Sequence, residues 1–456
     1  MSLLGADALL APLRQALTDS GLAEADLWVH RRQAAIARYS HSSIHQNAVS
    51  DETHVHARAI VGSAIGATSG NSLEPEALRD LLARAAELAT LQTPNADWPG
   101  LAAPSDNERR PIAFDLATAA LTASEQASAI GRITARATVA GFRAAGTHSV
   151  DVVEDAVANT NGVAAYAPMT VAYLRALVLG EHGGSGYADD LSHRAGELEA
   201  DRIADRAIEK CDLDRDRMQL PPGDYEAVFE EDAVAEILRI MSITGLSGQA
   251  VRDGRSFMAG TIGQQVTGEK FTLHDDALHP GQLAIPFDPE GTPRRRVALV
   301  ERGVARGPVY DRWSAKAAGV ASTGHAADAA RYGRGGHAGN LVMAGGTATR
   351  AELIGAVKRG ILITRFHYTN TPDPTRATMT GTTRDGTFLI EDGKITRALA
   401  NVRYTMSALD LFAGIDLLGP QRLVRDWWST NGMGSIVCLA PAMKVSRATI
   451  TGSSPA

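Results

Sequence analysis

The 456-residue sequence has only two cysteines, Cys211 and Cys438, which lie far apart and form no C-x-x-C pair. Disulfide bonds are therefore not what stabilises the fold. No apolar run approaches the roughly 18 residues that a membrane-spanning helix needs, and no basic segment precedes an apolar run near the N-terminus. These absences predict a cytoplasmic protein that does not associate with membranes.

The sequence also lacks a strong excess of either charge. Its 45 Lys and Arg residues and 52 Asp and Glu residues give a net charge of −7. A moderately acidic chain has no overall attraction for nucleic acid or for an anionic membrane surface, so neither is expected as a partner. The hydrophobic fraction of 44% and the charged fraction of 21% are ordinary for a globular protein.

The two halves of the chain differ in their patterns of apolar residues. In the first half, segments with helical spacing alternate with strand-like segments; the predicted helices cover residues 3–19, 73–91, 113–141 and 194–212. In the second half, short strand-like segments broken by glycine predominate, and the predicted helices cover residues 231–243 and 348–360. Thr349 and Glu352 have the spacing of a capping box at the start of the last helix.

These patterns predict an α+β fold in two domains, since 456 residues exceed the usual size of one domain. The boundary is expected near Pro221-Pro222-Gly223. Residues 1–215 should form a mainly antiparallel sheet with helices on one side. Residues 220–456 should form a β-rich, barrel-like or sandwich-like domain.

Four of the thirteen histidines fall within sixteen residues, at His41, His45, His54 and His56. A His-x-His pair on a strand places both imidazoles on one face, which would suit a metal site. A zinc site needs a third protein ligand, and none of the four comes with the glutamate of a His-Glu-x-x-His helix. We therefore interpret them as polar histidines on the solvated face of a hairpin, with a metal site as the alternative.

Several segments in a fixed order resemble the TldD/PmbA family of TldD–TldE metallopeptidases. They include GDYEAVFEEDAVAEIL, STGHA, GGHAGNLVMAGG, ELIGAVKRGILITRF and TGTTRDGTFLIEDGKITRALANVRY, which begin at residues 223, 322, 335, 352 and 380. The glycine-rich region from Gly62 to Gly70 also fits the family's N-terminal half. The resemblance covers nearly the whole chain and implies the α+β fold described above.

The family has two branches, and the resemblance is to the one without metal. TldD-like chains carry His-Glu-x-x-x-His on the helix at the start of the second domain, with a cysteine near the C-terminus as the third zinc ligand. Here that helix reads EDAVAEILRIMSITG, with Glu236 and Arg239 on the corresponding face. A guanidinium cannot ligate zinc. Cys438 lies closer to the following proline than the ligand cysteine does, and we interpret it as a small buried residue.

The resemblance therefore implies a PmbA/TldE-like subunit that has no catalytic residue and no metal of its own. Its partner would be a TldD-like chain that holds the zinc, in a heterodimer that cleaves unfolded peptides. The peptide would be held largely through its backbone, as an added strand is. Whether the isolated chain forms a homodimer stays open.

Residues that could line the substrate cavity lie in glycine-rich loops of the second half. Glycine lets the backbone approach a ligand closely. The segment RYGRGGHAGN and the end of the strand GILITRF supply six candidates: Arg331, Arg334, His337, Asn340, His367 and Tyr368. The alternative is that these are surface turns with solvated side chains.

Two further motifs are interpreted as turns. Asp288 and Glu290 flank Pro289, which favours a turn over a pair of catalytic carboxylates. Asp385-Gly386, between two apolar runs, predicts a hairpin.

Two other functions stay open at this point. One is a self-contained hydrolase of a peptide-derived small molecule, with a metal held by His325, His337 or His367. The other is a non-catalytic binding protein or homodimer.

Overall fold

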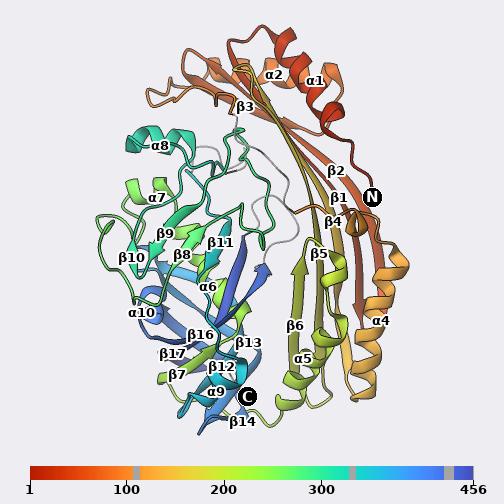
Figure 1. The fold of residues 1–456 in the computed structure, drawn as a ribbon, viewed down its shortest axis with the longest axis vertical. Helices are drawn as coiled ribbons and strands as arrows, with labels where there is room; N and C mark the ends of the chain where they lie inside the picture. Colours follow the sequence, from red (N-terminus) through yellow and green to blue (C-terminus); the bar gives the residue numbers. More distant parts are fainter. Residues whose placement is uncertain (106–112, 328–334, 426–435, 455–456) are drawn as a thin grey trace.

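The computed structural model describes residues 1–105, 113–327, 335–425 and 436–454. Two β-sheet assemblies lie side by side in Figure 1. The N-terminal half of the chain forms a long curved sheet, drawn on the right from red to yellow-green. The C-terminal half, drawn in green to blue, covers the concave side of that sheet.

The N-terminal sheet has six strands in the order β3-β2-β1-β4-β5-β6, and every neighbouring pair is antiparallel. This confirms the predicted antiparallel sheet. The strands are β1 (Glu24–Ser40), β2 (Ser43–Val61), β3 (Ala64–Gly70), β4 (Arg143–Asn159), β5 (Ala164–Leu179) and β6 (Ser185–Ser192).

Helices cover one face of this sheet, as predicted. Leu27 and Val29 of β1 pack beneath α1 (Ala6–Ser20) and α2 (Pro75–Thr90). Farther along the same face, Tyr39 packs beneath α4 (Ala123–Val139) and α5 (Ala200–Leu213). The short elements α3 (Leu116–Ala119) and η1 (Ala195–Glu197) complete this half. Because side chains alternate along a strand, the residues between these apolar ones point to the other half of the molecule.

The C-terminal sheet is mixed and curls into a closed ring. Strand β17 pairs with β15, β15 with β13, β13 with β12, β12 with β7, and β7 again with β17. This confirms the barrel-like prediction. The strands are β7 (Gly223–Phe229), β8 (Leu273–Asp275), β9 (Val297–Glu301), β10 (Val304–Ala305), β11 (Asn340–Met343), β12 (Arg359–Asp373), β13 (Thr378–Glu391), β14 (Lys394–Ala398), β15 (Val402–Ser407), β16 (Ile415–Arg425) and β17 (Val437–Ser453).

Helix α6 (Glu231–Gly245) belongs to the core of this half. Its apolar residues, from Ala233 to Met241, pack among side chains of β7, β12 and β17. The remaining elements are short and lie around it: α7 (Gly248–Arg252), α8 (Arg312–Ala318), α9 (Arg350–Gly355), η3 (Pro374–Arg376) and α10 (Ala408–Ala413).

Helix α9 begins as predicted and ends early. Thr349 and Glu352 form the expected capping box. The predicted helix ran to residue 360, whereas α9 ends at Gly355 because the buried strand β12 begins at Arg359. Burial in the sheet decides the conformation of this apolar segment.

One predicted turn and one predicted strand end are wrong, because the strands continue through both positions. Asp385-Gly386 lies inside β13, where Asp385 has a φ of 53° and the register with β12 shifts. Likewise, β12 does not end at Phe366 but runs to Asp373, with Tyr368 at a φ of 53°. Both sites are β-bulges, which place positive φ values within a strand.

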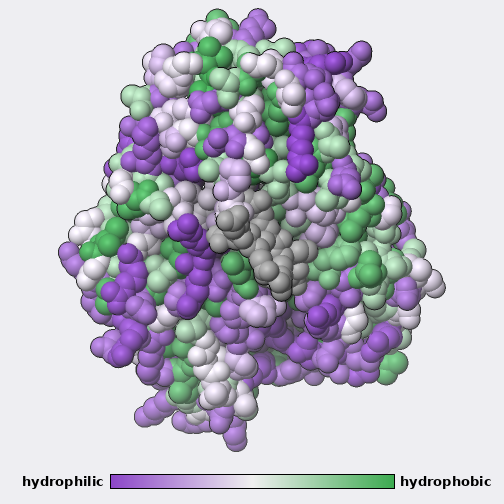
Figure 2. Space-filling view, turned by 45° about the horizontal axis from the view of Figure 1, so that its top comes forward, coloured by the Kyte–Doolittle hydropathy of each residue, from purple (hydrophilic) through white to green (hydrophobic). Residues whose placement is uncertain are grey.

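The surface in Figure 2 is mainly hydrophilic, with hydrophobic residues scattered over it in small groups. In the described parts of the chain, no helix is long and apolar enough to cross a membrane.

Arg422 of β16 joins the two halves through buried charges. One terminal nitrogen donates to Asp189 of β6 at 2.8 Å, and the other donates to Asp232 of α6 at 2.5 Å. Burial and the neighbouring Asp189 outweigh Arg422 and raise the pKa of Asp232 to about 7. For Asp189, burial disfavours the charged form, but Arg422 and two tyrosine hydroxyls outweigh it and lower the pKa. Beside the single guanidinium of Arg422, Asp189 thus ionises more readily than Asp232.

Arg422→Met should lower the free energy of unfolding by about 3–5 kcal/mol, because it leaves two buried carboxyl groups without their cation. Urea unfolding followed by circular dichroism measures this change. The matched control is Arg132→Met, since Arg132 pairs with Asp201 on the exposed surface, where water screens the pair. The control should keep the wild-type midpoint. An unchanged midpoint for Arg422→Met would contradict the assigned role.

The raised pKa of Asp232 predicts a pH dependence. Between the ordinary value of 3.8 and about 7, the folded state keeps a proton that the unfolded chain releases. The contribution of Asp232 to stability is therefore complete below this window and is lost as the pH rises through it. Asp232→Asn cannot titrate, so its stability relative to wild type should increase from pH 5 to pH 8. A difference that is constant with pH would contradict the assignment.

Candidate functional site

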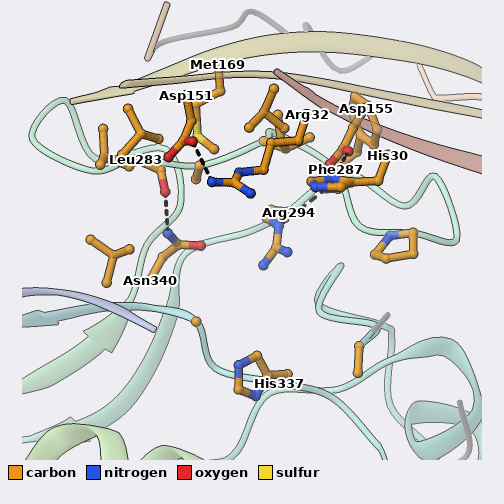
Figure 3. Close-up of a pocket in the computed structure, with 18 of the residues that line it drawn as sticks. His30, Arg32, Asp151, Asp155, Met169, Leu283, Phe287, Arg294, His337 and Asn340 are labelled. Atoms are coloured by element: carbon orange, nitrogen blue, oxygen red, sulfur yellow. Dashed lines mark hydrogen bonds and ion pairs between the residues drawn. The ribbon is translucent and has the colours of Figure 1, made fainter. Parts of the chain in front are cut away.

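A cavity of about 190 Å³ lies between the inner face of the six-stranded sheet and the C-terminal half. Figure 3 shows strand residues on one side of it and loop residues on the other. Its apolar wall includes Trp28, Met169, Leu283, Ile285 and Phe287. One water needs only about 10–15 Å³ of such volume, so the cavity is large enough for an organic group.

A histidine–aspartate pair lies on the sheet side of the cavity. His30 of β1 stands directly opposite Asp155 of β4, and its Nδ1 lies 2.7 Å from the carboxylate. An ionised carboxylate can only accept, so the Nδ1–H of His30 donates to Asp155. The side chain is buried, and Nε2 has no hydrogen-bond partner among the described residues.

An ion pair lies beside this histidine. Arg32 follows His30 at the next position on the same face, and its guanidinium donates to Asp151 of β4 at 2.6 Å. Burial raises the pKa of Asp151, and Arg32 opposes that rise. His30 and Arg32, which are successive residues on the inner face of β1, thus each bind a carboxyl group of β4.

Arg294 enters the cavity from the opposite side. Its Nε lies 3.4 Å from the carbonyl oxygen of Phe287, a long hydrogen bond. The terminal nitrogens form no hydrogen bond or ion pair with the described residues. In Figure 3 this guanidinium projects into the space between the strand residues and His337.

Two of the six predicted cavity residues line this cavity. Asn340 is buried and donates its side-chain amide to the carbonyl oxygen of Leu283 at 3.0 Å. His337 faces the cavity from the loop before β11, and its backbone N–H donates to the carbonyl oxygen of His325 at 2.8 Å. Arg331 and Arg334 lie outside the described residues.

The other two predicted residues lie elsewhere. His367 and Tyr368 are on β12, at the bulge described above, and neither lines the cavity. Their rings contact each other edge to face, with the ring centroids 4.4 Å apart, and Tyr368 is 62% exposed. The structure therefore does not bring them together with His337 and Asn340.

His325 is a buried structural histidine. Its Nε2 lies 2.9 Å from Asp275, and its Nδ1 lies 2.8 Å from the carbonyl oxygen of Thr323. Both ring nitrogens are thus occupied, which leaves none for the metal considered in the hydrolase alternative.

The histidine-rich N-terminal stretch forms the hairpin that the sequence predicts. His41 lies in the turn between β1 and β2, while His45 and His54 are exposed on β2. His56 differs from the prediction, because it is half-buried and stacks on Trp28 with ring centroids 5.0 Å apart.

Asp288 and Glu290 form a turn, as interpreted. One Asp288 oxygen accepts from the backbone N–H groups of Glu290 and Thr292 at 3.0 and 2.9 Å. Glu290 in turn accepts from Arg58 of β2 at 3.2 Å, so this turn also ties the two halves together.

Zinc is the metal that the family resemblance implies, and the residues of α6 do not fit it. Both oxygens of Glu236 accept from Arg239, at 3.0 and 3.1 Å. Within the described ranges, no three His, Cys, Asp or Glu residues lie close enough to hold a metal ion. Cys438 is buried in the core, as expected.

The sequence interpretation missed the sheet side of the cavity. Trp28, His30 and Arg32 alternate along β1, and Asp151 and Asp155 lie at positions of the same parity in β4. The sequence did contain a signal for this wall of the cavity: basic residues at alternate positions of β1 and acidic residues at alternate positions of β4. It was hidden because β4 is buried on both faces and has no simple apolar–polar alternation.

Comparison with known proteins agrees with this fold. Residues 222–452 match the family model for the PmbA/TldA metallopeptidase C-terminal domain, and residues 99–211 match that for the central domain. The chain belongs to the PmbA/TldA metallopeptidase family. The resemblance inferred from the sequence is thereby confirmed. The strands of the central domain share their sheet with β1, β2 and β3, which precede it.

Individual relatives come from both branches of this family. The crystal structure of TldE from Thermococcus kodakarensis superposes with a TM-score of 0.85 at 21% identity, covering 97% of this chain and all of that one. A metalloprotease TldD homolog of Haemophilus influenzae is 25% identical over 225 residues, 49% of this chain and 46% of that protein. A TldD homolog of Buchnera aphidicola is 25% identical over 268 residues, 56% of this chain and 54% of that protein. The chain thus spans about half the length of these curated relatives.

The Glu236–Arg239 pair predicts that the chain purified alone holds no stoichiometric zinc. Atomic absorption after dialysis against zinc-containing buffer, followed by gel filtration, measures the metal content. One zinc per chain would show that another set of residues binds the metal.

Proposed function

We propose that this chain is the metal-free, TldE-type subunit of a cytoplasmic TldD–TldE-type peptidase. A TldD-like partner would hold the zinc and its activated water. The present chain would complete the enclosure in which an unfolded peptide is held. The family membership established above supports the peptidase context of this proposal.

The observation that carries the proposal is the Glu236–Arg239 pair on α6. A zinc-activated water needs ligands that offer lone pairs to the metal. Here the guanidinium engages both oxygens of the one carboxylate on that helix face. When bound in the partner, zinc supplies Lewis-acid activation of water. The residues of α6 instead pack in the core of the C-terminal half.

The lining of the cavity supports binding over covalent catalysis. Among the described residues, the lining includes no serine, threonine or cysteine. His30 and Asp155 have the geometry of a base and its orienting carboxylate, but the lining residues that the structure describes place no hydroxyl or thiol nucleophile beside them. The self-contained hydrolase is also disfavoured by the occupied ring nitrogens of His325.

The chain alone should show no peptidase turnover, and activity should appear when it is mixed with a zinc-loaded TldD-like chain. A fluorescence-quenched unfolded peptide measures turnover, and a zinc-depleted partner is the control. Turnover by this chain alone, with zinc excluded by a chelator, would contradict the proposal.

Within that complex, His337→Ala should weaken peptide binding by about 1–2 kcal/mol, the scale of one buried hydrogen bond, and leave the partner's zinc in place. Exposed His54 on β2 offers a matched control in His54→Ala. Steady-state KM and kcat distinguish a role of His337 in peptide binding from a role in catalysis. A fall of several orders of magnitude in kcat with unchanged KM would mark His337 as catalytic.

A further inference from the structure

Strand β2 has a long free edge at the border of the six-stranded sheet. One side of β2 pairs with β1 from Ser43 onward, but β3 covers the other side only from Val55 to Val61. In the described chain, no strand pairs with residues 43–54 on that second side. Figure 1 shows this border of the sheet on the side away from the C-terminal half. An open edge of this length is a template for another extended chain.

The backbone groups that face this edge follow from the hairpin between β2 and β3. Gly62 and Ser63 have φ values of 57° and 70°, which is the two-residue turn that makes Val61 and Ala64 exchange both hydrogen bonds. Alternate residues of β2 therefore point their N–H and C=O groups away from β1. Beyond the end of β3, these residues are Asn47, Val49, Asp51 and Thr53. Their backbone groups have no hydrogen-bond partner among the described residues.

A groove of about 510 Å³ borders this edge on the face of the sheet that carries α4. Val49 and Ala35, which stand opposite each other, form part of its floor. Leu121 and Ala123, at the start of α4, form one wall. Val49 is 72% exposed. An added strand gains affinity from main-chain hydrogen bonds and specificity from side chains placed in such a groove, so its residue opposite Val49 should be apolar.

The other face of the edge carries a carboxylate that needs a cation. The side chain of Glu52 is 54% exposed, and its ion-pair contact in the described chain is with His54, at 4.0 Å. Arg32 stands opposite Glu52 on β1 but binds Asp151. A basic residue opposite Glu52 in an added strand would complete a cross-strand pair of opposite charges.

A second copy of this chain does not fit the edge. The antiparallel register that uses all four free residues pairs Asn47 with Thr53 and Val49 with Asp51. It would bring the turn at residues 41–42 of the second copy opposite residues 58–59, where β3 already pairs. A short extended segment has no such turn and can lie along the free edge in line with β3.

We propose that residues 47–53 of β2 bind an extended segment of an unfolded polypeptide as an antiparallel strand. The segment carries an apolar side chain opposite Val49 and a basic side chain opposite Glu52. The site lies on the border of the sheet, apart from the cavity, and the proposal does not rest on the peptidase role.

The test uses the full chain without any partner and a labelled octapeptide of threonine, with lysine at its second position and leucine at its fifth. N-methylation of the leucine removes an N–H that faces the edge, whereas N-methylation of the preceding threonine removes one that faces solvent. In fluorescence anisotropy, the first change should lower the affinity about tenfold and the second should leave it unchanged. Equal affinities of the two methylated peptides, or no binding of the parent peptide, would overturn the proposal.

Variants of the chain assign the contacts. Val49→Pro removes an N–H that faces the edge, and proline is tolerated on edge strands. It should abolish binding, whereas Val49→Thr should retain it. Replacing the lysine of the peptide by glutamate should weaken binding to wild type but not to Glu52→Gln. Equal binding of both peptides to wild type would overturn Glu52 as the charge contact. Thermal unfolding verifies that each variant folds, and the comparison of the methylated peptides does not depend on any variant.

Light scattering after gel filtration tests the second copy as the occupant of the edge. The mass of the chain should be the same for wild type and Val49→Pro. A wild-type dimer that becomes a monomer in Val49→Pro would show that the edge pairs with itself, and it would overturn the polypeptide segment as the ligand.

Discussion

Strand β4 at the centre of the six-stranded sheet is buried on both faces, and this constraint determines where the protein places its charged residues. Helices bury the outer face, and the C-terminal half buries the inner one. Because strand side chains alternate, His30, Asp151 and Asp155 lie buried on the inner face, where a charged or polar group requires a partner. Arg32 pairs with Asp151, His30 pairs with Asp155, and Arg422 reaches Asp189 from the other half. The cavity lies where this inner face meets the loops of the C-terminal half.

The same constraint relates the fold to the proposed role. Helix α6 lies in the core of the C-terminal half, and Asp232 in its first turn binds Arg422 at the contact between the halves. Its Glu236–Arg239 pair is satisfied within the helix and leaves no carboxylate oxygen directed to a metal. The chain therefore keeps the family's architecture while its residues at this helix serve packing and charge pairing.

Local patterns predicted much of the fold. Apolar spacing and the capping box at Thr349 predicted the antiparallel sheet, its helices and the start of α9. The hairpin predicted at Asp385-Gly386 and the strand end predicted at Phe366 failed for one physical reason. Asp385 and Tyr368 have turn-like backbone conformations, but pairing between β12 and β13 extends beyond both bulges. Such long-range pairing leaves no local mark in the sequence.

The site was predicted only in part, for a similar reason. His337 and Asn340 each follow a glycine in one short segment that leads into β11, and a local motif can indicate such residues. His30, Asp155 and Arg294 come from three distant segments, and only the packing of the two halves brings them to one cavity. The proposed function requires a metal-free chain beside a metal-bearing partner. The most direct test is anomalous X-ray scattering at the zinc edge from crystals of the complex with a TldD-like chain. We expect a single zinc peak per heterodimer, within the partner; a peak within this chain, beside α6 or in the cavity, would contradict the proposed function.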